Sequence, residues 1–136
     1  MDKSIPHEDF EEKRKYPRIV INSPIEILYK MHQLQAIIYD ISPDGLQIRS
    51  DNGILEKINP DNEVISEENA PLLEVNFHLK LSESNEKISA QCKMLYSMQL
   101  EDEKDKNVVS GLKFVNFEED GSKILDTYFA EEMTSY

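Results

Sequence analysis

Apolar side chains recur at every second position along much of this chain, and no other feature of the sequence restricts the possible folds as strongly. From Ile19 to Tyr29 one parity is mostly apolar, while Asn22, Glu26 and Lys30 occupy the other. A period of two puts alternate side chains on opposite faces of an extended chain, so this pattern predicts a half-buried strand. Pro24 indicates a bulge or an edge position within it. Similar or more continuously apolar patterns predict strands at 34–41, 46–50, 73–80, 88–100 and 108–117.

The period changes near the C-terminus. Apolar residues at 124, 125, 128 and 129 have the spacing of an amphipathic helix of about three turns. Ser42-Pro43-Asp44-Gly45 suits a type I turn and predicts a tight hairpin. Six strands with short connections and one final helix predict an all-β fold, a six-stranded antiparallel β-barrel with a C-terminal α-helix that plugs or packs on one opening.

One segment interrupts the strand pattern. Residues 51–71 are polar and acidic, with Pro60 and Pro71, and predict a long loop with one helical turn at 54–58. Two interpretations of this segment stay open: it is a surface for a protein partner, or it is a tolerated insertion.

The charge of the chain limits its partners. Its 136 residues fit one domain and carry a net charge of −12. Binding to DNA or RNA polymers needs a dominant basic face, so we expect no nucleic-acid polymer as a partner. A local anion site is still compatible with this charge, because physiological salt screens charges beyond about 8 Å.

Cysteine usage and hydropathy indicate the compartment. Cys92 is the only cysteine, which excludes an intramolecular disulfide and favours a reducing environment. It lies on the apolar phase of the strand at 88–100, which it shares with Met94, Tyr96 and Met98, and we expect a buried, inert thiol. No apolar run approaches the roughly 20 residues that span a membrane, and the chain start lacks a signal-peptide core. We expect a cytoplasmic protein with no membrane association.

The N-terminal region divides into two parts of opposite charge. Residues 1–12 are acidic and polar, and we expect a flexible tail followed by a single domain over residues 13–136. Residues 13–18 then hold four positive charges and no negative one, provided by Lys13, Arg14, Lys15 and Arg18. Two arginines four residues apart can converge on one ligand, since each guanidinium matches phosphate oxygens or the O6/N7 edge of guanine. The alternative is a basic stretch that balances the acidic tail.

A second motif, Asp40-x-Ser42-x-x-Gly45, lies at the predicted hairpin. An ionised Asp40 could accept the N1–H and N2–H₂ donors of a guanine, and Ser42 could donate or accept beside it. Gly45 would let the backbone turn sharply and would remove a Cβ that could block a planar base. The alternative is a well-made turn in which Asp40 and Ser42 cap backbone amides.

Sites for catalysis are not indicated. His7, His32 and His78 are widely separated, a single cysteine cannot build the usual zinc cluster, and there is no P-loop or Gly-x-Gly-x-x-Gly sequence. We therefore expect no catalytic residues, no metal site, no cofactor and no enzymatic activity.

Taken together, Arg14-x-x-x-Arg18 and the Asp40-x-Ser42-x-x-Gly45 motif, in this order and across a predicted strand, closely resemble the PilZ domain family. Gly111 and Phe114 look like the Gly-x-x-Phe sequence of that family's late strand, and 124–129 like its closing helix. The resemblance covers about residues 13–130.

The resemblance implies a bacterial receptor for cyclic di-GMP, built on a six-stranded antiparallel barrel. Arg14 and Arg18 would contact guanine and phosphate groups, and Asp40, Ser42 and Gly45 would line the surface under a guanine. Lys13 and Lys15 would add steering charge. Because Lys13 replaces an arginine that is frequent in the family, one ligand and an intercalated pair both stay open. The alternative function is a PilZ-like protein-interaction module that does not bind nucleotide.

These roles predict a mechanism for signalling. Ligand binding would order the Arg14–Arg18 segment across the barrel mouth and reposition the acidic tail, and this change would be the output to an unidentified downstream protein partner.

Overall fold

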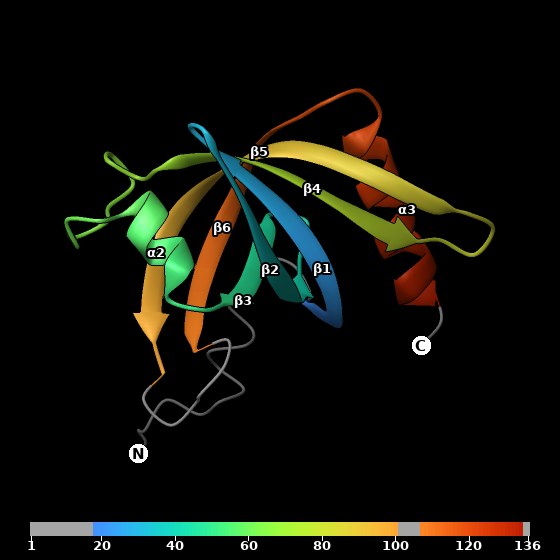
Figure 1. Cartoon of the computed structure of the whole chain (residues 1–136). Coiled ribbons are helices and arrows are strands. Elements are labelled where there is room, and N and C mark those ends of the chain that lie inside the picture. Colours follow the sequence, from blue (N-terminus) through green and yellow to red (C-terminus); the bar gives the residue numbers. More distant parts are fainter. Residues whose placement is uncertain (1–17, 101–106, 135–136) are drawn as a thin grey trace, which may run out of the picture.

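Six antiparallel strands form a closed barrel (Figure 1), as the period-two pattern predicted. The computed structural model describes residues 18–100 and 107–134. Around the barrel the strands follow the order β1-β2-β3-β6-β5-β4. The elements are β1 (Ile19–Tyr29), β2 (His32–Ile41), β3 (Gly45–Ser50), α2 (Gly53–Ile58), β4 (Leu72–Lys80), β5 (Asn85–Gln99), β6 (Val108–Phe117) and α3 (Gly121–Thr134). The predicted tail at 1–12 lies outside the described residues.

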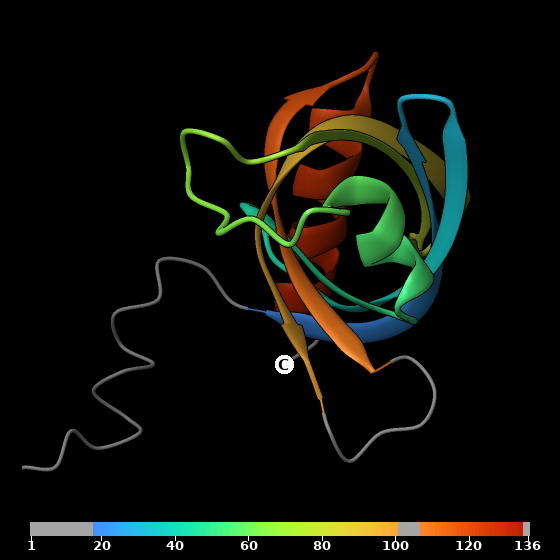
Figure 2. The same cartoon turned by 60° about the vertical axis from the view of Figure 1, so that its left-hand side comes forward.

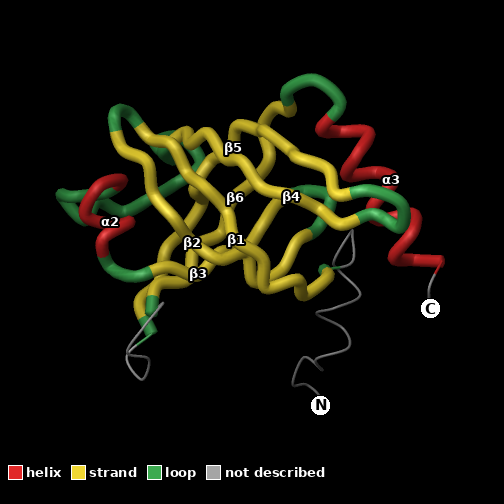
Figure 3. Tube along the Cα trace, turned by 45° about the vertical axis from the view of Figure 1, so that its right-hand side comes forward, coloured by secondary structure: helices red, strands yellow, loops and turns green. Residues whose placement is uncertain are grey.

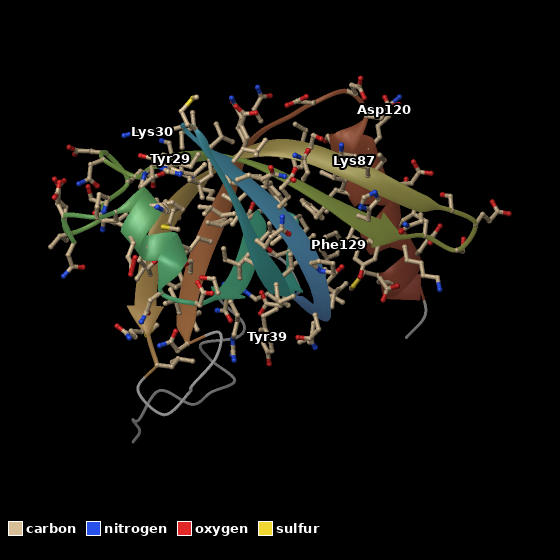
Figure 4. The ribbon with its side chains drawn as sticks, in the orientation of Figure 1. Tyr29, Lys30, Tyr39, Lys87, Asp120 and Phe129 are labelled. Carbon is tan, nitrogen blue, oxygen red and sulfur yellow. The ribbon has the colours of Figure 1, made fainter. Side chains whose placement is uncertain are left out.

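Backbone features of the β1–β2 hairpin explain where β2 begins and where β1 is irregular. β2 begins at His32 rather than at 34, because the β1–β2 turn is tight and Lys30 takes a positive φ of 54°. The Nζ of Lys30 lies 5.3 Å from the centroid of the Tyr29 ring at this hairpin tip (Figure 4). The pairing register of β1 with β2 shifts between Val20 and Ser23, just before Pro24, which confirms the bulge interpretation of that proline. Because the barrel is closed, β1 is not an edge strand.

The barrel interior is filled by the apolar phases of the strands. Ile27, Ile38, Ile48, Leu73 and Met94 have no measurable exposure, and they come from five different strands. Phe77 and Phe114 extend this core with ring centroids 6.4 Å apart. Core side chains from these strands therefore occupy the barrel interior.

Each end of the barrel is associated with one helix (Figure 3). The turn predicted at 54–58 is α2, which buries Ile54 and Ile58 in the core. Figure 2, seen roughly along the barrel, shows α2 in front of one opening. The acidic segment at 51–71 thus contributes to the core, which neither interpretation of that segment anticipated.

Helix α3 packs at the other end, as the C-terminal apolar pattern predicted. It buries Leu125, Tyr128 and Phe129, and the Tyr128 and Phe129 rings meet edge to face. The carboxylate of Glu131 accepts hydrogen bonds from the backbone N–H of Ser82, at 2.8 Å, and from the Ser82 hydroxyl, at 3.1 Å. These bonds tie α3 to the β4–β5 turn. No helix in the described ranges is long and apolar enough to cross a membrane.

The second half of β5 departs from the predicted phase. Its register with β6 shifts between Met94 and Tyr96, so Leu95 is an additional residue in the strand. A bulge of this kind turns the following side chains to the opposite face. Tyr96 and Met98, which share the apolar phase of Met94 in the sequence, are therefore 39% and 53% exposed.

Cys92 is fully buried on β5, and burial raises the pKa of its thiol to about 12. Because the thiolate is the reactive species, we expect Cys92 to be inert toward a disulfide reagent at pH 8 in the native protein. Release of the chromophore from such a reagent measures this. Guanidinium chloride should make the same thiol react within seconds, and fast modification of the native protein would contradict the buried assignment.

Candidate functional site

A pocket of about 370 Å³ lies beside the β2–β3 hairpin and against the outward side of β3, β5 and β6. This volume is at the lower end of the roughly 300–1,000 Å³ that is usual for small-ligand sites. Four of the residues predicted to bind the ligand line it together. Its lining consists of Arg18, Asp40, Ser42, Asp44, Gly45, Leu46, Gln47, Leu95, Tyr96, Gly111, Leu112 and Lys113.

Arg18 and Asp40 are brought to the pocket by the pairing of β1 with β2. Arg18 directly precedes β1, and Asp40 lies opposite Val20 in the β1–β2 register. Asp40 is only 8% exposed, whereas Arg18 is exposed. An exposed guanidinium group and a nearly buried carboxylate therefore line the same pocket. Lys13, Arg14 and Lys15 lie outside the described residues.

Ser42 closes the hairpin with its backbone and its side chain. Its N–H donates to the carbonyl of Gly45 at 2.9 Å, and the Gly45 N–H donates back to the Ser42 carbonyl at 3.3 Å. The Ser42 hydroxyl oxygen also accepts from the N–H groups of Asp44 and Gly45, both at 3.2 Å. The alternative in which Ser42 caps backbone amides is therefore confirmed for this residue. These hydrogen bonds hold the hairpin that forms one side of the pocket.

Gly45 is required for a different reason from the one we expected. The chain turns sharply here as expected, but Gly45 does not take a positive φ, so the turn does not depend on the conformational freedom of glycine. A Cβ at this position would instead collide with the backbone carbonyl oxygen of Leu112 and would lie 3.1 Å from the Cα of Lys113. Only glycine lets the hairpin approach β6 this closely, because backbone atoms of a paired strand cannot move away.

Lys113 also lines the pocket, and no motif in the sequence indicated it. In the β3–β6 register it lies directly opposite Gly45, and its outward position follows from that pairing. Its Nζ is 3.7 Å from the Oε2 of Glu67, and both side chains are more than half exposed. The acidic segment at 51–71 therefore reaches the rim of the pocket. Knowing that β6 pairs with β3 would have revealed Lys113.

The lining combines groups suited to an anion that also carries hydrogen-bond donors. Arg18 and Lys113 provide positive charge, while Asp40 and Asp44 provide acceptor oxygens. Within the described residues, no group of histidine, cysteine and carboxylate side chains could hold a metal ion. The arrangement can bind and orient a polar ligand.

A family model for the PilZ domain matches residues 12–131, almost the whole chain. The chain belongs to the PilZ domain family. The barrel order, the final helix and the hairpin agree with this assignment, and the resemblance seen in the sequence is confirmed. No curated protein sequence matches the chain significantly.

Two solved structures are similar to this chain, and the first of them shares its fold. The Bacillus subtilis inhibitor of motility, MotI/DgrA, is 15% identical over 90% of this chain and 52% of its own, with a TM-score of 0.66. The PlzA protein of Borreliella burgdorferi, in complex with c-di-GMP, is 16% identical over 91% of this chain and 56% of its own, with a TM-score of 0.47. This PilZ domain therefore spans about half the length of the solved chains that it matches.

Replacing Gly45 with alanine tests the close approach of the hairpin to β6. We expect Gly45→Ala to lower the free energy of unfolding by about 1–3 kcal/mol, since the added methyl overpacks against backbone. Chemical denaturation measures the change. Gly53→Ala is the matched control, because the nearest atom there is an Asp51 side-chain oxygen at 3.1 Å. Equal stability of the two variants would contradict the packing explanation.

Proposed function

We propose that this PilZ domain is a receptor for cyclic di-GMP and that the ligand binds in the pocket beside the β2–β3 hairpin. The observation that carries the proposal is the convergence of Arg18 with Asp40, Ser42 and Gly45 on one pocket. These residues come from two separate motifs, about twenty residues apart in the sequence. Their shared location supports a single ligand that contacts both motifs.

The chemistry of the pocket suits the two kinds of group in a cyclic dinucleotide. Arg18 would donate to phosphate oxygens or to the O6/N7 edge of a guanine. Asp40 would accept from the N1–H and N2–H₂ groups of a guanine, a pairing that adenine cannot offer. Lys113 would add positive charge opposite the hairpin. Arg14 is proposed to act with Arg18, and Lys13 and Lys15 to steer the anionic ligand toward the site.

The competing proposal is a protein-interaction module that does not bind nucleotide. The presence of Arg18 and the hairpin residues Asp40, Ser42 and Gly45 in one pocket of ligand size argues against it. Membership of the PilZ family supports a binding role rather than catalysis. We further propose a bacterial, cytoplasmic location, which the single reduced cysteine supports, and an unidentified downstream protein partner.

Calorimetry with cyclic di-GMP tests the ligand and the site together. We expect the wild-type chain to bind it and not GTP. Arg18→Ala should weaken binding about 5- to 150-fold, since a bidentate arginine contact discriminates by roughly 1–3 kcal/mol. Lys87→Ala is a charge-matched control, because Lys87 lies on β5 toward the α3 end, away from the pocket (Figure 4). Absence of wild-type binding would overturn the proposed ligand, and full binding by Arg18→Ala would overturn the site.

Hydrogen exchange tests the signalling step. We propose that Arg14 and Arg18 both hold the ligand, so bound ligand should slow amide exchange across residues 8–18. Mass spectrometry of peptides from this segment, with and without saturating cyclic di-GMP, measures the effect. The Arg18→Ala variant should show no slowing at the same ligand concentration. Unchanged exchange in the wild-type chain would contradict the switch without affecting the binding site.

A further inference from the structure

Tyr96 reaches the pocket because of a local irregularity in β5. The strand keeps its alternation up to Met94, and the register with β6 then shifts so that Tyr96 lies opposite Gly111. If the strand kept its regular alternation through Leu95, Tyr96 would point into the core with Met94. Bulges that re-aim a side chain are common beside binding sites. Here the bulge takes a large aromatic out of the core and places it in the pocket lining.

The glycine opposite Tyr96 provides a place for the ring. A Cβ on Gly111 would overlap the ring, with Cζ at 2.6 Å and Cδ2 at 2.8 Å from its position. The ring therefore lies over the Gly111 backbone, on the outward side of β6. The rest of the ring surface is accessible to solvent, since Tyr96 is 39% exposed.

A hydrogen bond from a third strand fixes the orientation of the ring. The Gln47 side-chain amide donates to the Tyr96 hydroxyl at 3.2 Å. Gln47 lies opposite Gly111 in the β3–β6 register, so the three residues form a row across β3, β6 and β5. All three also line the pocket. The Gly111 backbone contacts one face of the Tyr96 ring and Gln47 holds its hydroxyl, so the ring keeps one orientation although it is partly exposed.

We propose that Tyr96 is a base-stacking platform, on which one guanine of the ligand lies flat. This inference rests on the proposed function, and it assigns the recognition of the base's aromatic face to a residue outside both sequence motifs. Stacking on an aromatic side chain does not depend on the hydrogen-bonding edge of the base. Asp40 and Arg18 would then select guanine by its edge, while Tyr96 contributes affinity. Lys113 is the next residue of β6 after Gly111 that points outward, and it lines the same pocket. Its ammonium group could therefore contact a phosphate of the same ligand.

Two substitutions separate the aromatic face from the bulk of the side chain. Tyr96→Leu keeps an apolar side chain and removes the ring, and we expect it to weaken cyclic di-GMP binding about 5- to 100-fold in calorimetry. Tyr96→Phe keeps the ring and should stay within about threefold of wild type. Tyr29→Leu, a tyrosine substitution at the β1–β2 hairpin, is the control and should not change the affinity. Circular dichroism verifies that each variant is folded.

Gly111→Ala tests the support of the ring without touching its chemistry. The added methyl should displace the Tyr96 ring and weaken binding in the wild-type background. In a Tyr96→Ala background the same substitution should have little further effect, because the stacking is already lost. If Gly111→Ala lowers the affinity by the same factor in both backgrounds, the proposed pairing of Tyr96 with Gly111 is overturned.

Tyrosine fluorescence gives a direct spectroscopic signature. Stacking on guanine should quench part of the emission when cyclic di-GMP is added, and that quenching should be absent in Tyr96→Phe. If the wild-type chain binds, Arg18→Ala does not, and Tyr96→Leu binds as wild type, the stacking role fails while the proposed function stands. If the wild-type chain does not bind cyclic di-GMP, both fail.

Discussion

The pairing of β1 with β4 closes the barrel, and the rest of the molecule depends on this contact. Four residue pairs make it, from Ile25 opposite Phe77 to Leu28 opposite Glu74. Across the same seam, Asn76 donates to the carboxylate of Glu26 at 3.1 Å. Without this pairing both strands would be open edges, with unsatisfied backbone groups and an exposed apolar face. With the barrel closed, the pairing of β1 with β2 keeps the start of β1 next to the end of β2, and Arg18 and Asp40 line the same pocket there.

The pocket depends on a second constraint, the unusually close passage of the hairpin over β6. Gly45 and Gly111 serve different purposes in it. At Gly45 two backbones approach each other, whereas at Gly111 a backbone meets an aromatic ring. In both cases the missing side chain allows a contact that shapes the pocket lining. Glycine is used at these two places for proximity and not for an unusual backbone conformation.

Much of this architecture could be predicted from the sequence because burial of one face imposes alternation on a strand. The strands follow from that rule or from continuous apolar runs, and the final helix follows from the same burial with a helical period. The bulge in β5 could not be predicted, because Leu95 is apolar and fits either phase of the pattern. The exposure of Tyr96 and Met98 therefore differed from expectation.

The pocket residues divide in the same way. Arg18, Asp40, Ser42 and Gly45 could be predicted because they belong to compact motifs. Lys113 and Tyr96 could not, since their position depends on how β6 pairs with β3 and β5, which local sequence does not specify. Arg14, Lys13 and Lys15 lie outside the described residues, and their part in the site stays a prediction.

The location of α2 has a consequence for how such a domain can diversify. Ile54 and Ile58 are buried at one end of the barrel and α3 packs at the other, so a helix covers each end of the core. The pocket lies on the outer wall of the barrel, where exposed side chains such as Arg18 and Lys113 contribute nothing to the core. Substitution of these exposed side chains can change what the pocket accepts with little effect on folding, whereas Gly45 is constrained by its contact with β6. Ligand preference and thermodynamic stability are thereby left free to evolve separately.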